Sequence, residues 1–404
     1  MPDNRAATVE FDHITKRYDA SADARSRPGA VDDLSLAVPA GRICVLVGPS
    51  GCGKTTTLRM VNRLVEPSAG RVRVDGVDIA TRDLVELRRG IGYVIQQVGL
   101  FPHQRIGENV ATVPRLLGWS AARRRERAEE LLALVGLDPA TYRDRFPAQL
   151  SGGERQRVGV ARALAADPPI LLMDEPFGAV DPIVRERLQN ELLRLQETLA
   201  KTILFVTHDI DEAIKMGDLV AVMAVGGKLL QYGPPEEILA RPASSFVAQF
   251  VGTDRGLKRL SLARVSELPI RPAISARAGD SAGAARERIL ADPFPYLLLV
   301  DQLDRPIGWL DQHSVPADGV LTAASAIPMS PLFDRRTTLK DALSMLLDAD
   351  VQAGVLVDRD RRTRGIVTVG MVADWFRASA AGELPATVAE VAAADPSAAA
   401  AVRV

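Results

Sequence analysis

The segment from residue 42 to residue 70, RICVLVGPSGCGKTTTLRMVNRLVEPSAG, contains the motif that decides the fold. Its apolar run Ile43–Val47 predicts a short buried strand, and residues 55–64 have helical character that ends before Pro67. Between these elements the chain matches G-x-x-x-x-G-K-[ST], the P-loop pattern, in the strand–loop–helix setting that the motif requires. The segment therefore predicts an α/β domain that binds a nucleotide where this strand ends.

The residue types of this loop suit a phosphate ligand. Glycines let backbone N–H groups turn inward around phosphate oxygens at a helix N-terminus, where the helix dipole already favours anions. Lys54 can reach the β- and γ-phosphates, and the Thr55 hydroxyl can bind Mg²⁺. The alternative, a glycine-rich turn with an exposed lysine, is disfavoured by the correct flanking elements. The predicted nucleotide-binding residues of the loop are Gly48, Pro49, Ser50, Gly51, Cys52, Gly53, Lys54, Thr55 and Thr56.

A second apolar strand is predicted over residues 170–173, within PPILLMDEP. It is too apolar for any position but the centre of a sheet, so Asp174 and Glu175 should lie at its carboxyl edge. Asp174 fits a carboxylate that binds Mg²⁺ directly or through water, and Glu175 fits a base that polarises an attacking water. An acidic turn after a strand is also common in proteins where it has no such catalytic or metal-binding role, so this motif alone does not establish one.

Between these two motifs lies AQLSGGERQRVGVARALAADP, which predicts a helix that begins at Ser151-Gly152-Gly153 and ends by Pro168. Its unpaired N–H groups make a second anion site in the same chain. L-S-G-G-E-R-Q, at residues 150–156, resembles the signature motif of ABC-type ATPases, and it lies between the two Walker motifs as in that family. The resemblance implies that Ser151, Gly152, Gly153 and Glu154 bind a nucleotide.

Four further residues are assigned by the same resemblance. Gln96, in GYVIQQVGLFPH, is similar to the Q-loop glutamine that meets Mg²⁺ and the attacking water, with Gln97 beside it as the alternative. Asp181, in FGAVDP, resembles the D-loop aspartate, and His208, in ILFVTHDIDEA, resembles the switch histidine that contacts the γ-phosphate. Tyr18, in ITKRYDA, is similar to the aromatic residue that stacks on adenine, although it also fits an ordinary strand tyrosine.

The resemblance implies a complete catalytic set that is shared between two chains. In this family the signature motif of one subunit closes over the Walker A nucleotide of another, so we expect a head-to-tail pair with two ATP molecules between the chains. The implied catalytic residues are Glu175, His208, Lys54, Gln96 and Asp181. The implied Mg²⁺ ligands are Thr55, Gln96 and Asp174. The expected fold is an α/β P-loop core with an antiparallel β patch and a helical subdomain around residues 105–165.

Composition excludes several classes of protein. Lys and Arg number 50 against 51 Asp and Glu, which argues against a protein whose main task is to coat nucleic acid. No run approaches the roughly 18 apolar residues of a membrane span, and MPDNRAATVEFDH has no signal-peptide core. Two cysteines are too few for a disulfide framework. We therefore expect any membrane role to come through a partner.

From about residue 253 the motifs give way to an internal repeat. Asp301 and Asp358 are 57 positions apart, as are Gly308 and Gly365. Each copy predicts a helix, a strand, a charged turn and a second strand, so we expect two small units that pack together. The arrangement resembles a tandem CBS pair, a smaller α+β regulatory module that binds adenosine-containing ligands or senses ionic conditions. Thr368 matches this family's pattern, but the acidic residue usually three positions later is absent.

An ABC ATPase followed by such a pair resembles the energising subunit of importers for glycine betaine, carnitine, choline or proline betaine. The local strings MVNRLVEPSAG and FVGTDRGLKRLSL add to the resemblance. It implies a multi-span permease and, through it, a substrate-binding protein as partners, no nucleic acid, and a peripheral position on the cytoplasmic face of the membrane. An importer for methionine, another amino acid or a sugar, and a non-transport ABC ATPase, stay open as alternatives. The expected boundaries are 1–252 for the ATPase, 253–376 for the CBS pair and 377–404 for a flexible Ala-rich tail.

One charged turn in the second repeat carries a regulatory hypothesis. Residues 358–364, DRDRRTR, include the arginines Arg359, Arg361, Arg362 and Arg364. Most charge runs are simply solvated surfaces. The alternative is an ionic-strength sensor, because cations docked on anionic lipid are screened over roughly 8 Å at physiological salt. Rising salt would then release the module from the membrane.

Overall fold

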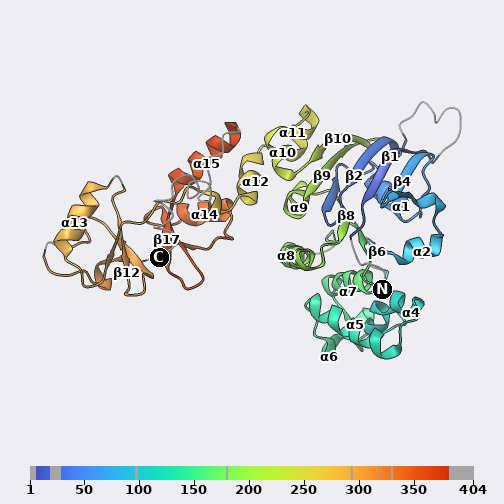
Figure 1. The fold of residues 1–404 in the computed structure, drawn as a ribbon, viewed down its shortest axis with the longest axis horizontal. Coiled ribbons are helices and arrows are strands. Elements are labelled where there is room, and N and C mark those ends of the chain that lie inside the picture. Colours follow the sequence, from blue (N-terminus) through green and yellow to red (C-terminus); the bar gives the residue numbers. More distant parts are fainter. Residues whose placement is uncertain are drawn as a thin grey trace. The chain divides into compact units, whose positions relative to one another are not determined.

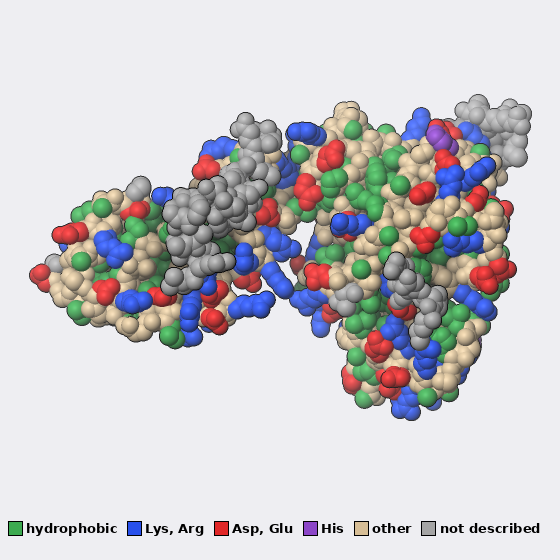
Figure 2. Space-filling view, viewed as in Figure 1, with side chains coloured by type: hydrophobic (Ala, Val, Ile, Leu, Met, Phe, Trp, Pro, Cys, Tyr) green, Lys and Arg blue, Asp and Glu red, His purple; other side chains and the backbone are tan. Residues whose placement is uncertain are grey.

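The computed structural model describes residues 6–18, 29–95, 99–178, 181–292, 294–316, 318–328 and 331–381. The contacts within the chain divide it into two compact units, and the boundary in the sequence falls between Thr253 and Asp254 (Figure 1). Each unit is described here by itself. On the face shown in Figure 2, acidic and basic side chains are interspersed over both units. None of the described helices is long and apolar enough to cross a membrane.

A six-stranded sheet, with the strand order β10-β9-β3-β8-β7-β6, forms the centre of the first unit. Its strands are β3 (Ile43–Val47), β6 (Ile91–Val94), β7 (Ile170–Asp174), β8 (Thr202–Thr207), β9 (Leu219–Ala224) and β10 (Lys228–Gly233). All neighbours pair in parallel except β9 and β10. Every residue of β3, β7 and β8 is buried, which is why these strands read as continuous apolar runs.

A second, antiparallel sheet shares its core with the first. It has the order β2-β1-β4-β5 and consists of β1 (Val9–Lys16), β2 (Val31–Val38), β4 (Ala69–Val74) and β5 (Val77–Asp78). In β2, every second residue from Leu34 to Val38 is buried, as expected for a sheet with one face toward solvent. Phe11 and Leu36 belong to the same buried cluster as Leu46 of β3 and Leu58 of α1.

The remaining part of the first unit is helical. A group of helices between β6 and β7 corresponds to the helical subdomain expected around residues 105–165, and α4, α5, α6 and α7 lie together in Figure 1. The group comprises α3 (Ile106–Val110), α4 (Thr112–Leu116), α5 (Ala121–Leu134), α6 (Pro139–Tyr142) and α7 (Gly152–Leu164). The other helices are α1 (Lys54–Val61), α2 (Leu84–Arg89), α8 (Pro182–Leu199), α9 (Ile210–Met216), α10 (Pro235–Ala240) and α11 (Ser245–Val251).

The second unit repeats one pattern at the spacing of 57 residues. Adding 57 to the first residues of β11, α13 and β13 gives Leu332, Leu339 and Thr363, where β15, α14 and β17 begin. The first copy contains β11 (Ser275–Arg277), α13 (Ala282–Ala291), β12 (Leu297–Val300) and β13 (Pro306–Leu310). The second copy contains β15 (Leu332–Phe333), α14 (Leu339–Leu347), β16 (Ala353–Val357) and β17 (Thr363–Thr368). The unit is completed by α12 (Arg255–Leu262), β14 (Ile327–Pro328) and α15 (Val369–Ala381).

Each copy pairs with a short segment that precedes the other copy in the chain. Ile327 of β14 precedes the second copy but pairs with Trp309 of the first, and Arg271 precedes the first copy but pairs with Ile366 of the second. A buried cluster that includes Trp309 and Val355 joins the two sheets. The copies therefore form one body.

The helix α15 crosses a boundary that the sequence suggested. It continues to Ala381, so the limit expected at residue 376 falls inside it. The reason is packing, because Val372 and Trp375 are buried with Leu260 of α12 and hold the helix against the unit. Residues 382–404 lie outside the described part of the chain.

Candidate active site

Three strand ends bring the predicted site together. Val47 of β3 lies beside Thr207 of β8, and Val206 of β8 lies beside Asp174 of β7. The P-loop, the acidic pair and His208 follow these positions, so they meet at one edge of the sheet. Parallel α/β sheets bind their ligands at this carboxyl edge.

The P-loop depends on glycine at two positions. A Cβ at Gly48 would lie 2.3 Å from the Met223 carbonyl oxygen, and a Cβ at Gly53 would lie 2.2 Å from the Ala30 carbonyl oxygen. Gly53 also has a φ of 96°, which side chains rarely adopt, and α1 begins immediately after it. These close approaches let the loop curve tightly and aim its N–H groups at an anion.

Lys54 lies within the curve of this loop. It is buried, with 6% of its surface exposed, and its Nζ donates to the carbonyl oxygens of Gly48 at 2.7 Å and Pro49 at 3.0 Å. The ammonium is therefore held on the inner side of the loop. This position suits a charge-assisted bond to a phosphate oxygen.

Thr55 and Asp174 form the oxygen pair expected for a metal. The Thr55 hydroxyl donates to Asp174 Oδ1 at 2.8 Å. Burial raises the pKa of the Asp174 carboxyl, and the bond from Thr55 acts against this rise. Mg²⁺ favours one or two carboxylates together with phosphate oxygens, and this pair fits that preference.

Glu175 and His208 follow β7 and β8 and lie in contact with each other. His208 Nδ1 is 3.3 Å from Glu175 Oε1, and both side chains are partly exposed to solvent. Glu175 has a φ of 47°, and its amide donates to the Val206 carbonyl at 3.0 Å, which holds the strained residue in place. The carboxylate therefore projects from the sheet edge beside the imidazole.

The signature segment forms a capped helix start. Ser151 Oγ accepts from the Glu154 amide at 3.3 Å, and Glu154 Oε2 accepts from the Ser151 amide at 2.6 Å, which is a capping box. Glu154 also accepts from the Tyr142 hydroxyl at 2.6 Å, and this bond, with the Ser151 amide, lowers the pKa of its carboxyl. Glu154 is thus engaged within its own chain, while Ser151 and Gly152 are exposed.

The remaining predicted residues have different outcomes. Asp181 caps α8, where its carboxylate accepts from the Val184 amide at 3.1 Å. Tyr18 is 68% exposed, and its hydroxyl lies 3.4 Å from Thr56 Oγ1, next to the P-loop helix. Lys16 Nζ lies 5.2 Å from the Tyr18 ring centroid. Gln96 lies outside the described residues.

Arg59 is a site residue that the sequence reasoning missed. Its Nη2 lies 3.9 Å from Asp174 Oδ2, and the hydrogen bond that the guanidinium donates to the neighbouring Tyr93 raises the pKa of Arg59. Arg59 follows Thr55 by four residues on α1, so helical spacing would place both on one face. That spacing is the signal that could have identified it.

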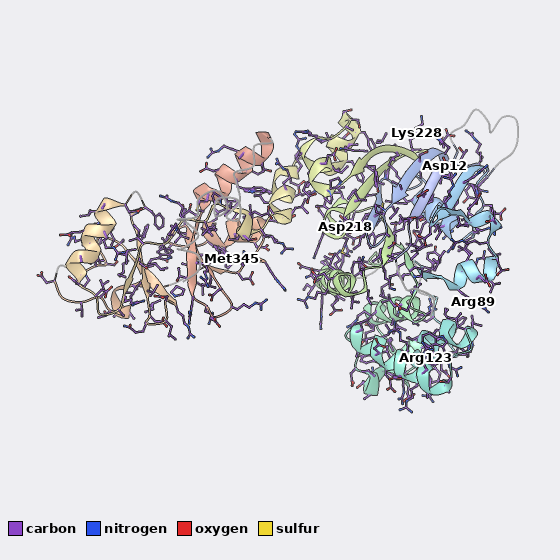
Figure 3. The ribbon with its side chains drawn as sticks, viewed as in Figure 1. Asp12, Arg89, Arg123, Asp218, Lys228 and Met345 are labelled. Atoms are coloured by element: carbon purple, nitrogen blue, oxygen red, sulfur yellow. The ribbon has the colours of Figure 1, made fainter. Side chains whose placement is uncertain are left out.

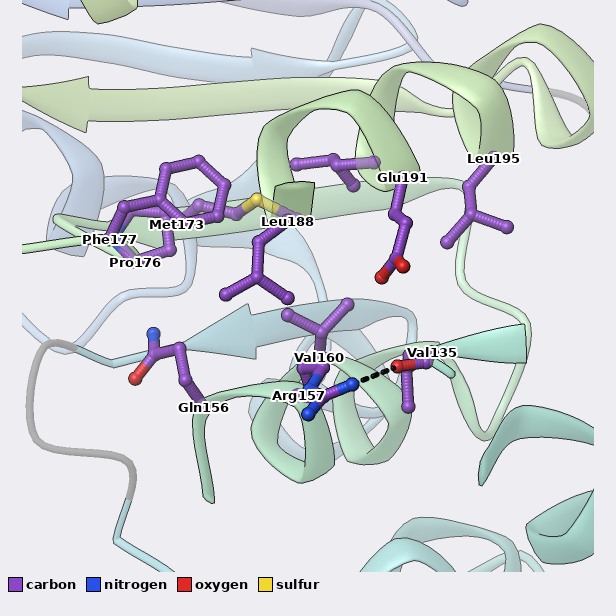
Figure 4. Close-up of a pocket in the computed structure, with 11 residues that line it drawn as sticks. Val135, Gln156, Arg157, Val160, Met173, Pro176, Phe177, Leu188, Glu191 and Leu195 are labelled. Atoms are coloured by element: carbon purple, nitrogen blue, oxygen red, sulfur yellow. Dashed lines mark hydrogen bonds between the residues drawn. The ribbon is translucent and has the colours of Figure 1, made fainter. Parts of the chain in front are cut away.

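An apolar pocket lies apart from this site, between α7 and α8 (Figure 4). Leu188 and Leu195 of α8 face Val160 of α7 across it, and Arg157 donates to the Val135 carbonyl at 3.4 Å. No residue of the P-loop or the acidic pair lines it. The pocket therefore belongs to the packing of the helical subdomain on the core.

A P-loop, a buried acidic strand and a histidine at one sheet edge, together with a capped Ser-Gly-Gly helix start elsewhere in the same unit, define an ATP-binding cassette. The family model described as ABC transporter matches residues 31–178. The chain belongs to the ATP-binding proteins of the ABC transporter family, and it is an ABC-type ATPase.

Relatives match along almost the whole chain. The osmoprotectant import ATP-binding protein OsmV of Salmonella typhimurium is 43% identical over 370 residues, which cover 91% of this chain and 96% of the relative. The glycine betaine/carnitine/choline transport ATP-binding protein OpuCA of Bacillus subtilis is 43% identical over 349 residues, which cover 85% of this chain and 91% of that protein. Both alignments are too long to be confined to the first unit.

Solved structures match the cassette. The ATP-binding cassette MJ0796, solved as a dimer bound to ADP and Pi, has a TM-score of 0.51 and 34% identity and covers 56% of this chain and 98% of its own. The structure of cbiO1 from Clostridium perfringens, part of the ABC transporter complex cbiONQ, has a TM-score of 0.52 and 26% identity, with 58% and 91% covered. The P-loop ABC ATPase fold and nucleotide binding are therefore confirmed for this chain.

Proposed function

We propose that this chain is the ATPase of an importer for a quaternary ammonium osmoprotectant such as glycine betaine, choline or carnitine. The observation that carries the proposal is the length of the match to OsmV, which includes the second unit as well as the cassette. OpuCA of Bacillus subtilis and OpuBA, its choline transport counterpart, are each 43% identical and have related substrates in their names. A relationship to cassettes in general would account only for the first unit.

Hydrolysis is proposed to occur between two copies of the chain arranged head to tail. Lys54 and the P-loop amides bind the phosphates, and Ser151 with its helix N-terminus completes the site from the other copy. Thr55, Asp174 and Gln96 would hold Mg²⁺, which neutralises phosphate charge when it is bound. Glu175 takes a proton from the attacking water, and His208 contacts the γ-phosphate. His208 also lies 3.3 Å from the Glu175 carboxylate, so it keeps this group in position as well. Tyr18 is proposed to stack on adenine.

The membrane partner is proposed to be a multi-span permease that also receives a substrate-binding protein. Its contact surface on this chain would follow the Q-loop, where Phe101 is 40% exposed and tilts against the His103 ring at 6.0 Å. The chain would then work as a peripheral subunit on the cytoplasmic face of the membrane. An exposed aromatic residue that follows the Q-loop in the chain suits such a contact.

Uptake measurements test this function. A host without osmoprotectant uptake, supplied with the permease, the binding protein and this chain, should accumulate labelled glycine betaine, choline or carnitine. The Lys54→Met chain should reduce that uptake to near background, because it binds ATP about 100-fold more weakly and lacks the ammonium that stabilises phosphate charge during hydrolysis. Accumulation of labelled methionine, with none of the three quaternary ammonium compounds, would contradict the proposal.

The second unit is proposed to be a regulatory tandem CBS pair. The repeat of 57 residues and the pairing of each copy with a segment that precedes the other support this assignment. Cavities of about 320 and 500 Å³ open at Arg271 and Thr368. Asp374 lines the larger one, one helical turn after the position where the CBS pattern has an acid. Phe294 of the first copy lines the smaller cavity, so a small ligand bound there would lie between the two copies.

The charged turn offers a second route of regulation. Arg364 donates to Asp358 Oδ2 at 2.8 Å and forms an ion pair with this carboxylate. Arg359, Arg361 and Arg362 are exposed. Three cations on one turn suit an anionic membrane surface, where each Arg near the surface contributes roughly 1 kcal/mol.

Replacing Arg359, Arg361 and Arg362 with Gln should shift the salt dependence of transport. In a reconstituted transporter with anionic lipid, the variant should reach half-maximal transport at lower salt, because less screening is needed to release the module. The matched control replaces the exposed Arg286, Arg288 and Arg335 with Gln, which removes the same charge from the second unit. An equal threshold in both variants would exclude the turn as a sensor.

A further inference from the structure

The loop that carries His208 is connected to a buried carboxylate with no assigned role. Glu212 lies on α9, and only 6% of its surface is exposed. Burial raises the pKa of this carboxyl, and the Thr207 hydroxyl, Arg185 and His208 act against the rise, whereas Asp209 adds to it. Keeping an acid at a buried position is unfavourable unless its oxygens are well bonded. Its partners therefore indicate what the residue does.

Glu212 controls a hydroxyl beside the histidine. Thr207 Oγ1 donates to Glu212 Oε2 at 2.6 Å and accepts from the Asp209 amide at 3.0 Å. Thr207 and Asp209 are the two neighbours of His208 in the chain. Because the hydroxyl proton is directed to Glu212, the oxygen lone pairs face the Asp209 amide and hold the turn closed around His208.

The same carboxylate reaches the helix that begins at the D-loop. Gln189 of α8 is also buried, and its Nε2 donates to Glu212 Oε1 at 3.4 Å. Arg185 of α8 lies 3.8 Å from both Glu212 Oε1 and Asp209 Oδ2. Asp181 caps the first turn of that helix. Glu212 thus joins α8 to the turn that places His208 against Glu175.

We propose that Glu212 is a positioning residue for His208, which it orients through the Thr207 hydroxyl and links to the D-loop helix α8. The inference rests on the role proposed above for His208 in hydrolysis. Glu212 itself touches neither the nucleotide nor the water. Its effect is to keep the imidazole beside Glu175, where a small displacement would weaken the positioning on which hydrolysis depends.

The test replaces Glu212 with Met, which keeps the volume and removes the acceptor for Thr207. We expect kcat for ATP to fall about tenfold and KM to change by less than about twofold, because positioning is lost and nucleotide contacts are not. Glu212→Gln, which retains an acceptor oxygen, should keep most of the activity. The control is Glu186→Met on α8, whose side chain is 72% exposed. Thr207→Val, which removes the hydroxyl from the other side, should reproduce the effect if Glu212→Met folds poorly.

A measurement on the nucleotide-free protein distinguishes a loss of His208 positioning from a general loss of protein stability. The chain has four histidines, so the ring signals of His208 can be assigned in NMR spectra by their loss in His208→Ala. They should shift or broaden in Glu212→Met and Thr207→Val but not in Glu186→Met. In the His208→Ala background, Glu212→Met should have no further effect on residual phosphate release.

Two results would overturn the inference: unchanged His208 signals in Glu212→Met, or an undiminished tenfold effect of that substitution in the His208→Ala background. Full activity of His208→Ala alone would instead reject the proposed role of His208. The two failures can therefore be distinguished.

Discussion

Replacing Glu175 with Gln should give a protein that binds ATP but hydrolyses it at least about 100-fold more slowly, since a general base contributes 10²- to 10⁴-fold to rate. The amide cannot accept a proton from water, yet it keeps the size of the side chain at this strained position. Phosphate release measures the loss, and isothermal titration with ATP measures the retained affinity. Because ATP is bound but hydrolysed only slowly, it should also trap the head-to-tail pair, which size-exclusion chromatography would detect.

The matched control for this variant is Glu66→Gln, which changes an acid that is 71% exposed and paired with Arg63. It should hydrolyse ATP at the wild-type rate. Near-normal turnover in Glu175→Gln would refute its assignment as the base. Loss of ATP binding in that variant would instead indicate that Glu175 supports the loop and does not act on water.

Replacing Lys54 with Met should weaken ATP binding about 100-fold, because bonds to a charged donor contribute roughly 1.5–3 kcal/mol and each 1.4 kcal/mol is tenfold in affinity. In the wild-type protein the ammonium is held in the loop by the Gly48 and Pro49 carbonyls, so its position is set before the phosphate arrives. Met has similar length but neither charge nor a donor. Titration with a fluorescent ATP analogue measures the change.

The control is Lys228→Met, at the start of β10, where Lys228 is exposed on the surface of the first unit (Figure 3). It removes the same charge without touching the loop. Equal affinities in the Lys54 and Lys228 variants would contradict the role of Lys54. Thermal unfolding of both variants shows whether each is folded. This control matters because Lys54 is buried, whereas Lys228 is exposed.

The local parts of the site were predictable from short segments. The strands β3 and β7 are continuous apolar runs, so the residues after each were correctly placed at the carboxyl edge. Ser151 and Asp181 were expected at their motifs, and both proved to be helix caps, a role that depends on only the next few residues. The repeat of 57 residues also located the two copies of the second unit.

Contacts between distant elements were not predictable in the same way. Arg59 shares a helix face with Thr55, but its place beside Asp174, like that of Glu212 beside Gln189, depends on how the helices pack in the folded unit. In the second unit, the pairing of each copy with a segment that precedes the other depends on a crossing between the two copies. The domain boundary predicted at residue 376 falls inside α15, because Trp375 is buried and the helix continues to Ala381.

The amino-acid sequence was sufficient to identify a nucleotide-binding cassette, because the phosphate site is a strand, a loop and a helix that are consecutive in the chain. It was also sufficient to locate the change to a second unit near residue 253. Only the tertiary structure showed that Glu154 is engaged by Tyr142 and that Glu212 supports the turn of His208. The physical reason is that these partners belong to separate elements that meet only when the chain packs. At Glu154 the end of α6 meets the start of α7, and at Glu212 α8 meets α9.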